Sequence, residues 1–265
     1  MDKRMIKYII DRWYIKKPRF REFVTRLLYG SKSCYVRLFD TRVHLNTLRE
    51  NGYFRVSKME KNSSLLHHEV AVMLNLTHLV KSDSTFIDIG ANIGVYSIFF
   101  AKFQHLYSQF SVHAFEVHPD TFSRLSVNAQ EHNFEAYCFA ISDTKKVDKF
   151  IEGAVSHVTT MASKLNAYSK KGAYFEAKCL PLSEFTFDGG NLILKIDVEG
   201  QEYEVLEGAR SFFEDERVTC VYLDGYSDKR VLMFLQSYGF EFFDGRTLKK
   251  SDGNIFALLA IRSTD

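Results

Sequence analysis

The sequence has few prolines and few cysteines, and each shortage disfavours a class of protein. Its three prolines are Pro18, Pro119 and Pro181. They are too far apart to form the Asn/Asp-Pro-Pro-aromatic segment that grips a flipped base, so chemistry on a nucleobase is disfavoured. The four cysteines form no C-x-x-C pair. This argues against a zinc site and predicts a reduced, cytoplasmic location.

Long hydrophobic runs are also missing. The 265-residue chain contains no stretch of about 18 consecutive apolar residues, so we expect no membrane-spanning helix. At the N-terminus, charged residues interrupt the apolar ones, which a signal peptide's apolar core does not allow. The length is sufficient for one large domain with a small appendage.

Positive charge is concentrated at the N-terminus. Residues 1–29 contain nine Lys/Arg and three Asp/Glu, so with +2 for the whole chain the remainder carries about −4. An acidic main domain argues against a nucleic-acid partner.

Residues 1–29 predict two short helices, broken near Pro18, that each have an apolar side and a basic side. A basic amphipathic helix with a tryptophan, here Trp13, can lie on a membrane surface or dock on a protein partner. Alternatively, the segment packs on the main domain and its charges are solvated. We favour packing on the main domain, and the membrane reading would make the protein peripheral at a membrane.

One stretch organises the rest of the chain. Residues 85–89 predict a strand buried on both faces, because all but Asp88 are β-branched or aromatic. Gly90 and Gly94 have no side chain, so the backbone can turn sharply there and a ligand can approach it closely. Residues 95–103 have the apolar content of a helix that packs on a sheet. Free N–H groups at such a helix start attract a nucleotide-like cofactor.

The loop could bind either of two cofactors, NAD or S-adenosylmethionine, or it could be a tight turn that binds no ligand. The NAD fingerprint uses three glycines, whereas Asn92 stands here in place of the second, and Asp88 would repel a pyrophosphate. Asp88 suits the amino group of S-adenosylmethionine (SAM) instead. Glu116 lies 22 residues after Gly94, at the end of a predicted strand, where an acidic residue meets the ribose hydroxyls of either cofactor.

Strands and helices alternate along the chain, and the last two strands have no helix between them. We therefore predict an α/β fold with a doubly wound, mostly parallel sheet that ends in an antiparallel hairpin. An N-terminal appendage of helices and a β-hairpin would occupy residues 1–60, and the main domain residues 61–265.

The individual elements follow from apolar periodicity. The predicted strands are 85–89, 110–115, 135–141, 191–198, 218–223, 240–243 and 254–261. The predicted helices are 65–80, 95–103, one beginning at Pro119, 202–213 and 231–235. Residues 34–56 predict the hairpin of the appendage, and residues 152–176 a long mobile excursion beside the site.

Four segments resemble the FkbM-type SAM-dependent methyltransferases. They are FIDIGANIGVYS (86–97), AFEVHPDTFSRLSVN (114–128), AISD (140–143) and LILKIDVEGQEYEVLEGA (192–209). The resemblance implies a class I Rossmann-like fold and a SAM-dependent O-methyltransferase that acts on a hydroxyl of a small molecule, either a glycan or a natural product. It implies cofactor contacts from Asp88, Gly90, Ala91, Asn92 and Gly94 to the methionine part, Glu116 to the ribose, Ser142 and Asp143 near the adenine, and Glu69.

Charged residues follow the two strands expected next to this cofactor. Side chains alternate between the two faces of a strand, so Lys195, Asp197 and Glu199 lie on one side at the end of the strand predicted over 191–198. Asp224 directly follows the strand predicted over 218–223. Asp197 or Glu199 could remove the acceptor's proton with Lys195 nearby, or Lys195 could merely form an ion pair.

Asp197 and Asp224 could instead hold Mg²⁺. The sequence offers no third ligand, and we favour the metal-free version. The alternatives to an O-methyltransferase are a non-catalytic SAM-fold module and, disfavoured by the loop, a nicotinamide-dependent oxidoreductase.

Overall fold

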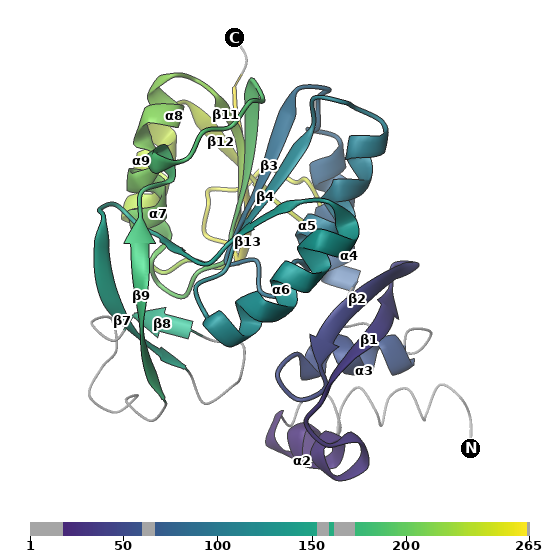
Figure 1. Cartoon of the computed structure of the whole chain (residues 1–265). Helices are drawn as coiled ribbons and strands as arrows, with labels where there is room; N and C mark the ends of the chain where they lie inside the picture. Colours follow the sequence, from purple (N-terminus) through teal and green to yellow (C-terminus); the bar gives the residue numbers. More distant parts are fainter. Residues whose placement is uncertain (1–17, 60–66, 153–158, 162–172, 264–265) are drawn as a thin grey trace. The chain divides into compact units, whose positions relative to one another are not determined.

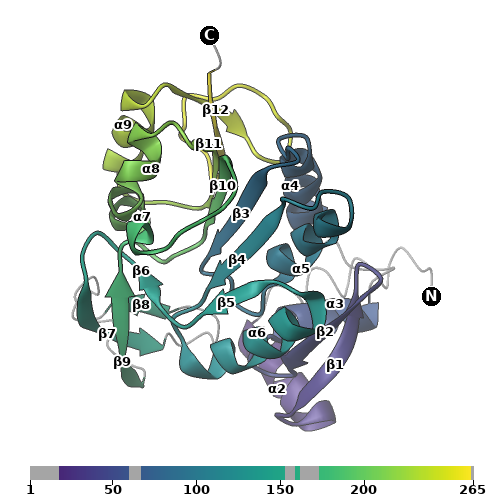
Figure 2. The ribbon, with the colours of Figure 1, turned by 45° about the horizontal axis from the view of Figure 1, so that its top comes forward.

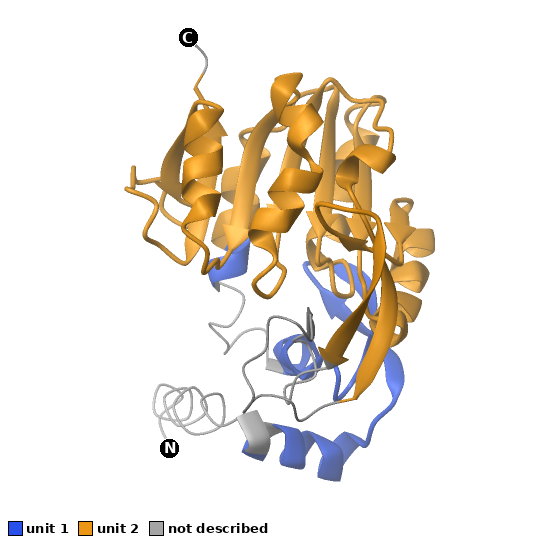
Figure 3. Ribbon diagram, turned by 90° about the vertical axis from the view of Figure 1, so that its left-hand side faces the viewer, with its two compact units in different colours: residues 1–70 blue, residues 71–265 orange. Residues whose placement is uncertain are grey.

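The computed structural model describes residues 18–59, 67–152, 159–161 and 173–263 (Figure 1). The chain forms two compact units, Met1–Val70 and Ala71–Asp265 (Figure 3). This division lies after the domain boundary predicted at residue 60, and that boundary stays a prediction. The predicted first helix, before Pro18, lies outside the described residues.

Residues 18–59 of the first unit form two helices and a hairpin. They are α2 (Pro18–Tyr29), β1 (Ser33–Leu38), β2 (Thr41–Asn46) and α3 (Asn51–Met59). Phe39 and Asp40 both adopt positive φ, the backbone twist that a two-residue hairpin turn requires. The predicted hairpin is confirmed, but its extension to Val56 is wrong. The Asn46 side chain accepts the N–H groups of Leu48 and Arg49, and the chain then turns into α3.

The second unit is built on a seven-stranded sheet (Figure 2). Five strands are parallel, in the spatial order β5 (Glu135–Tyr137), β4 (Ser111–Phe115), β3 (Ser84–Ile89), β10 (Asn191–Ile196) and β11 (Val218–Asp224). The strand β13 (Ala257–Arg262) pairs antiparallel with β11 and with the edge strand β12 (Phe240–Asp244). The predicted fold class is therefore confirmed.

The strand order reverses between β3 and β10. The chain runs outward from β3 to β4 and β5, and later returns to β10 on the other side of β3. In such a sheet a crevice opens beyond the carboxyl ends of the two central strands. Every residue of β3 and all but the first of β10 are buried, so these ends are held in a packed core.

Helices cover both faces of the sheet (Figures 1 and 2). One face carries α5 (Val95–Ala101), the short helix η3 (Lys102–His105) and α6 (Pro119–His132). The other carries α7 (Glu202–Gly208), α8 (Arg210–Glu214) and α9 (Arg230–Ser237). The helix α4 (His67–Thr77) crosses the division between the units. The single helix predicted over 202–213 is divided at Ala209, next to the point where Gly208 packs against the carbonyl of Ser142.

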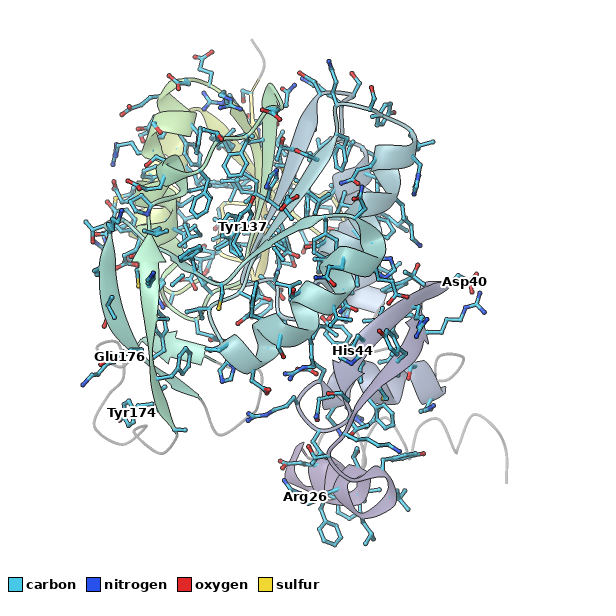
Figure 4. The ribbon with its side chains drawn as sticks, viewed as in Figure 1. Arg26, Asp40, His44, Tyr137, Tyr174 and Glu176 are labelled. Atoms are coloured by element: carbon cyan, nitrogen blue, oxygen red, sulfur yellow. The ribbon has the colours of Figure 1, made fainter. Side chains whose placement is uncertain are left out.

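A second, four-stranded sheet lies between β5 and β10 in sequence. Its order is β6 (Ala140–Ile141), β9 (Tyr174–Leu180), β7 (Lys146–Glu152) and β8 (Thr159–Met161), and Figure 4 labels Tyr174 and Glu176 on β9. The strand predicted over 135–141 is thus split between two sheets. The excursion predicted over 152–176 contains β8 and the start of β9, and its remainder falls partly outside the described residues. Neither β7 nor β9 is buried along its whole length: Lys146, Val147 and Lys149 of β7 and Tyr174, Glu176 and Lys178 of β9 are exposed. The sequence therefore offers no continuous buried run to reveal these strands.

Leu194 tests the packing of the central strand. Its side chain is fully buried on β10, whereas 71% of Leu106 is exposed in the same unit. We expect Leu194→Ala to lower the free energy of unfolding by about 2–5 kcal/mol, because it leaves a cavity. Leu106→Ala should change it by less than about 0.5 kcal/mol. Urea unfolding of both variants measures this, and equal effects would contradict the described core.

Candidate active site

A cleft lies beyond the carboxyl ends of β3, β4 and β10. Its polar lining includes Asn92, Glu116, Asp197, Glu199 and Gln201, and its apolar lining includes Phe115, Phe139, Ile141 and Phe150. The cleft thus lies at the topological switch point, where the sequence analysis expects the cofactor.

The loop after β3 forms the floor of the cleft. Gly90, Asn92 and Gly94 all have positive φ, of 75°, 53° and 81°. The N–H groups of Gly90 and Ala91 both donate to the carbonyl of Phe115 on β4, at 3.0 and 2.9 Å. An added Cβ on Gly90 would lie 2.0 Å from the carbonyl oxygen of Asp197. The predicted strand, glycine turn and helix are confirmed, and the turn requires glycine because the end of β10 approaches it so closely.

A buried ion pair joins this loop to the end of β10. The Lys195 ammonium lies 3.0 Å from Asp88 Oδ1 and 3.4 Å from Asp197 Oδ2, and it donates to the Gly90 carbonyl at 3.0 Å. Ser97 donates to the other Asp88 oxygen at 2.7 Å. Burial by itself lowers the pKa of Lys195, but the charges of Asp88 and Asp197 outweigh it and hold the pKa above its usual range. Lys195 therefore stays protonated.

This geometry places Lys195 and Asp88 beneath the cleft. Both side chains are almost fully buried, and neither residue is part of the cleft lining. The ion pair that the sequence left open as an alternative for Lys195 is present. Asp88 shapes the loop through Ser97 and Lys195, and its direct contact with a cofactor stays a prediction.

Glu116 follows β4 and lines the cleft, as predicted for a ribose-binding residue. Its two oxygens accept the N–H groups of Asn92 at 2.9 Å and His118 at 2.8 Å. Burial raises the pKa of Glu116 to about 7, although these two hydrogen bonds oppose the rise. A carboxylate has about four acceptor positions, so Glu116 can still accept hydroxyl groups from a ligand.

Asn92 supplies an observation that fits the predicted SAM. Its Oδ1 is buried, and no group in the described part of the chain donates to it. A buried carbonyl oxygen without a donor is costly, and the amino group of the methionine part of SAM is such a donor. With Glu116 for the ribose and Phe139 and Ile141 as apolar lining for an adenine, the residues present fit SAM.

Asp197 is the carboxylate that faces the cleft beside the loop. About 42% of its side chain is exposed, and burial against the cleft walls raises its pKa while Lys195 opposes the rise. In the register of β10 and β11, Ile196 pairs with Leu223, so Asp197 and Asp224 follow at the same level. Asp224 accepts from Tyr222 at 3.1 Å and does not line the cleft. Across the described ranges, no group of three or more His, Cys, Asp or Glu could hold a metal ion, so Mg²⁺ stays a prediction without a third ligand.

Five other predicted cofactor residues are not part of the cleft lining: Ala91 and Gly94 of the loop after β3, Ser142, Asp143 and Glu69. Ser142 is fully buried and donates to Asp143 at 3.0 Å, and the residues just before it line the cleft instead. Glu69 belongs to the first unit, where the Tyr53 hydroxyl donates to it at 3.4 Å. The roles of these five residues as cofactor contacts stay predictions.

Sequence reasoning missed several residues of the cleft, among them Phe139, Gln201 and Phe150. Gln201 is 5% exposed and lies inside the KIDVEG-x-E segment, so the motif itself could have revealed it. Phe150 comes from β7 of the second sheet, and no sequence signal connected that strand with the cleft.

Comparison with known proteins gives one family. The model of the methyltransferase FkbM domain matches residues 88–242. No curated protein matches the chain.

Solved structures match it at low identity. The precorrin-6y C5,15-methyltransferase of Geobacter metallireducens is 13% identical, with a TM-score of 0.40 over 73% of this chain and 87% of that one. A TehB-like SAM-dependent methyltransferase of Corynebacterium glutamicum is 12% identical, with a TM-score of 0.40 over 80% and 95%. The Pyrococcus abyssi tRNA (uracil-54, C5)-methyltransferase, in complex with S-adenosyl-L-homocysteine, is 12% identical, with a TM-score of 0.42 over 88% and 44%. Sequence identities and TM-scores this low say nothing about the reaction that this chain catalyses.

Gly90 and Gly200 form a matched pair that tests the close approach of the loop to β10. Both have positive φ, of 75° and 78°, but among the described residues nothing lies within 4 Å of a Cβ added to Gly200. Gly200→Ala should cost only the left-handed conformation, about 1–2 kcal/mol. Gly90→Ala must also displace the carbonyl of Asp197, so we expect more than about 3 kcal/mol and loss of SAM binding. Calorimetry and urea unfolding measure both, and equal effects would contradict the described contact.

The raised pKa of Glu116 predicts two opposite pH dependences. Its pKa is raised from 4.5 to about 7 in the folded protein. Its contribution to stability is thus fully present below the unfolded pKa and is lost as the pH rises through about 7. Ribose hydroxyls donate to the ionised form, so SAM affinity should fall as the pH drops through about 7.

Glu116→Gln should abolish the pH dependence of SAM affinity. It should also weaken binding above about pH 7 by roughly 10- to 100-fold, because charge-assisted hydrogen bonds are lost. Glu214→Gln, on the exposed side of α8, is the control and should behave as wild type. Titration calorimetry from about pH 5.5 to about pH 8.5 measures the profile, and an unchanged profile in Glu116→Gln would remove Glu116 from the cofactor site.

Proposed function

Because the chain belongs to the FkbM methyltransferase family, we propose that this SAM-dependent methyltransferase acts on a hydroxyl oxygen of a small molecule, a glycan or a natural product. One observation carries the proposal. Asp197 presents a carboxylate to the cleft beside the cofactor loop, and a buried ammonium holds it there. Transfer to a hydroxyl needs such a base, because the oxygen must lose its proton.

The cofactor side of the cleft is formed by the loop after β3 and the end of β4. When bound, SAM supplies a methyl group on a positively charged sulfur. Glu116 would bind the ribose, Asn92 would accept from the amino group, and Phe139 would contact the adenine. These contacts fix where the methyl group points, and such alignment provides much of the rate in an in-line displacement.

On the acceptor side, Asp197 takes the hydroxyl proton on a carboxylate oxygen. Burial raises its pKa, which makes it a better base than an exposed aspartate, while Lys195 favours its ionised form. Lys195 also lies between Asp88 and Asp197, where an ammonium supplies the positive charge that Mg²⁺ would otherwise bring. The metal-free version is therefore the one we propose, and Glu199, exposed in the cleft lining, is the second candidate base.

The charge of the cleft supports an acceptor that is neutral or cationic. Its lining includes three carboxylates, Glu116, Asp197 and Glu199, and no Lys, Arg or His from the described part of the chain. A phosphorylated or carboxylated acceptor would meet repulsion there and find no counter-charge. The compartment that we propose is the cytoplasm, and the four free cysteines support it.

Asp197→Asn tests the proposed base. We expect the rate of methyl transfer to fall at least about 100-fold, because the amide cannot take the proton, while SAM affinity stays within about threefold. Asp215→Asn, at an exposed position, is the control. Transfer of a labelled methyl group to neutral sugars, amino sugars and sugar phosphates measures the rate and the charge preference. If Asp197→Asn abolishes SAM binding, Asp197 belongs to the cofactor site instead.

Turnover in the presence of a chelator tests the metal-free version. Activity should survive chelation, because Lys195 already provides the cation. Full loss of activity that is restored by Mg²⁺ would show that a metal is needed. SAM binding without turnover on any acceptor of the panel would favour the non-catalytic module.

A further inference from the structure

Among the described residues of the first unit, the contacts of helix α2 with α3 come from one side of the helix. The side-chain amide of Asn51 donates to Thr25 Oγ1 at 2.6 Å, and Thr25 is 1% exposed. One turn later, the ring of Tyr29 meets Phe54 edge-on, with 4.9 Å between the ring centroids. Thr25 and Tyr29 are four residues apart, so they define the attached side of the helix.

The opposite side of α2 is apolar and exposed. Phe20, Phe23, Leu27 and Leu28 are 52%, 60%, 72% and 65% exposed. The first three are spaced three and four residues apart and therefore form one stripe along the helix. An amphipathic helix of a globular unit normally turns this stripe inward, but within the described part of the first unit α2 turns it outward. An exposed apolar patch of this kind marks an interaction surface.

The charge of the first unit indicates what this surface contacts. Residues 1–70 contain 16 Lys/Arg and 7 Asp/Glu, a net charge of +9. The second unit, with 19 Lys/Arg and 26 Asp/Glu, has a net charge of −7. On α2 itself Arg26 lies beside the apolar stripe with 64% of its side chain exposed (Figure 4), and it pairs with Glu22 at 2.9 Å. Exposed apolar side chains on a strongly basic unit are complementary to a partner that has anionic groups at its surface and an apolar interior beneath them.

We propose that α2 binds the surface of an anionic lipid bilayer, with Phe20, Phe23 and Leu27 inserted at the boundary between head groups and acyl chains. Basic residues of the first unit then contact the head groups, each contributing to the attraction. A nucleic acid would use the charge and the rings of Phe20 and Phe23, but not Leu27 and Leu28, which offer neither a stacking ring nor a donor to phosphate. No helix among the described residues is long and apolar enough to cross a membrane, so the contact is peripheral.

Vesicle sedimentation of the full chain tests the proposal. The probes are vesicles of phosphatidylcholine alone and vesicles with about a third phosphatidylserine, at low salt and at about 0.5 M salt. We expect wild type to bind the vesicles that contain phosphatidylserine and to be released by salt. Phe23→Ser/Leu27→Ser should weaken binding at least about tenfold, because it removes the inserted groups.

A matched control separates the stripe from general surface apolarity. Leu106→Ser/Met233→Ser removes two residues of the second unit that are 71% and 60% exposed. It should bind vesicles as wild type does. Thermal unfolding and size exclusion of both variants verify that they fold and keep the same assembly state.

Two outcomes would overturn the proposal. Wild type that does not bind the anionic vesicles excludes the membrane. If the Phe23→Ser/Leu27→Ser variant binds these vesicles as wild type does, the apolar stripe of α2 is not the part that contacts the membrane. If vesicle binding is absent and Phe23→Ser/Leu27→Ser instead lowers the melting temperature or changes the assembly state, the stripe is covered by the chain's own second unit or by a second copy.

Discussion

The ammonium of Lys195 is the group on which the arrangement of the site depends. Asp88 has no solvent exposure, and a buried carboxylate is stable only when it is paired and hydrogen-bonded. Lys195 provides this pairing, and through the Gly90 carbonyl and Asp197 it also ties the loop after β3 to the end of β10. Removing one partner of such a pair costs about 3–5 kcal/mol, because the other charge stays buried alone.

Around this ion pair, the two sides of the cleft differ in their electrostatics. Glu116 accepts two N–H groups but is far enough from solvent that its pKa reaches about 7. Asp197 is partly open to the cleft and is paired with Lys195. The first arrangement suits neutral hydroxyl donors of a ribose, and the second suits proton removal from an acceptor. In the proposed function, these two carboxylates, at the ends of β4 and β10 on either side of β3, have different roles because their surroundings differ.

Most of the main sheet could be predicted, because its strands are buried on both faces and appear as apolar runs. The same reasoning failed for β7 and the start of β9, which have no continuous buried run, and for Ala209, where the close packing of Gly208 on Ser142 divides a helix. For the site, Gly90 and Glu116 follow from spacing along the chain. That Asp88 is held by Lys195, and not turned towards the cleft, depends on contacts between β3 and β10 that spacing does not contain.

The most direct test of the site is a crystal structure of the protein with S-adenosylhomocysteine, the product of SAM after methyl transfer. We expect the ribose hydroxyls within hydrogen-bond distance of Glu116 and the amino group at Asn92 Oδ1. We also expect Asp197 on the side of the cleft that the sulfur faces, still paired with Lys195. A ligand bound elsewhere, or one whose ribose does not contact Glu116, would contradict this assignment of the cofactor site.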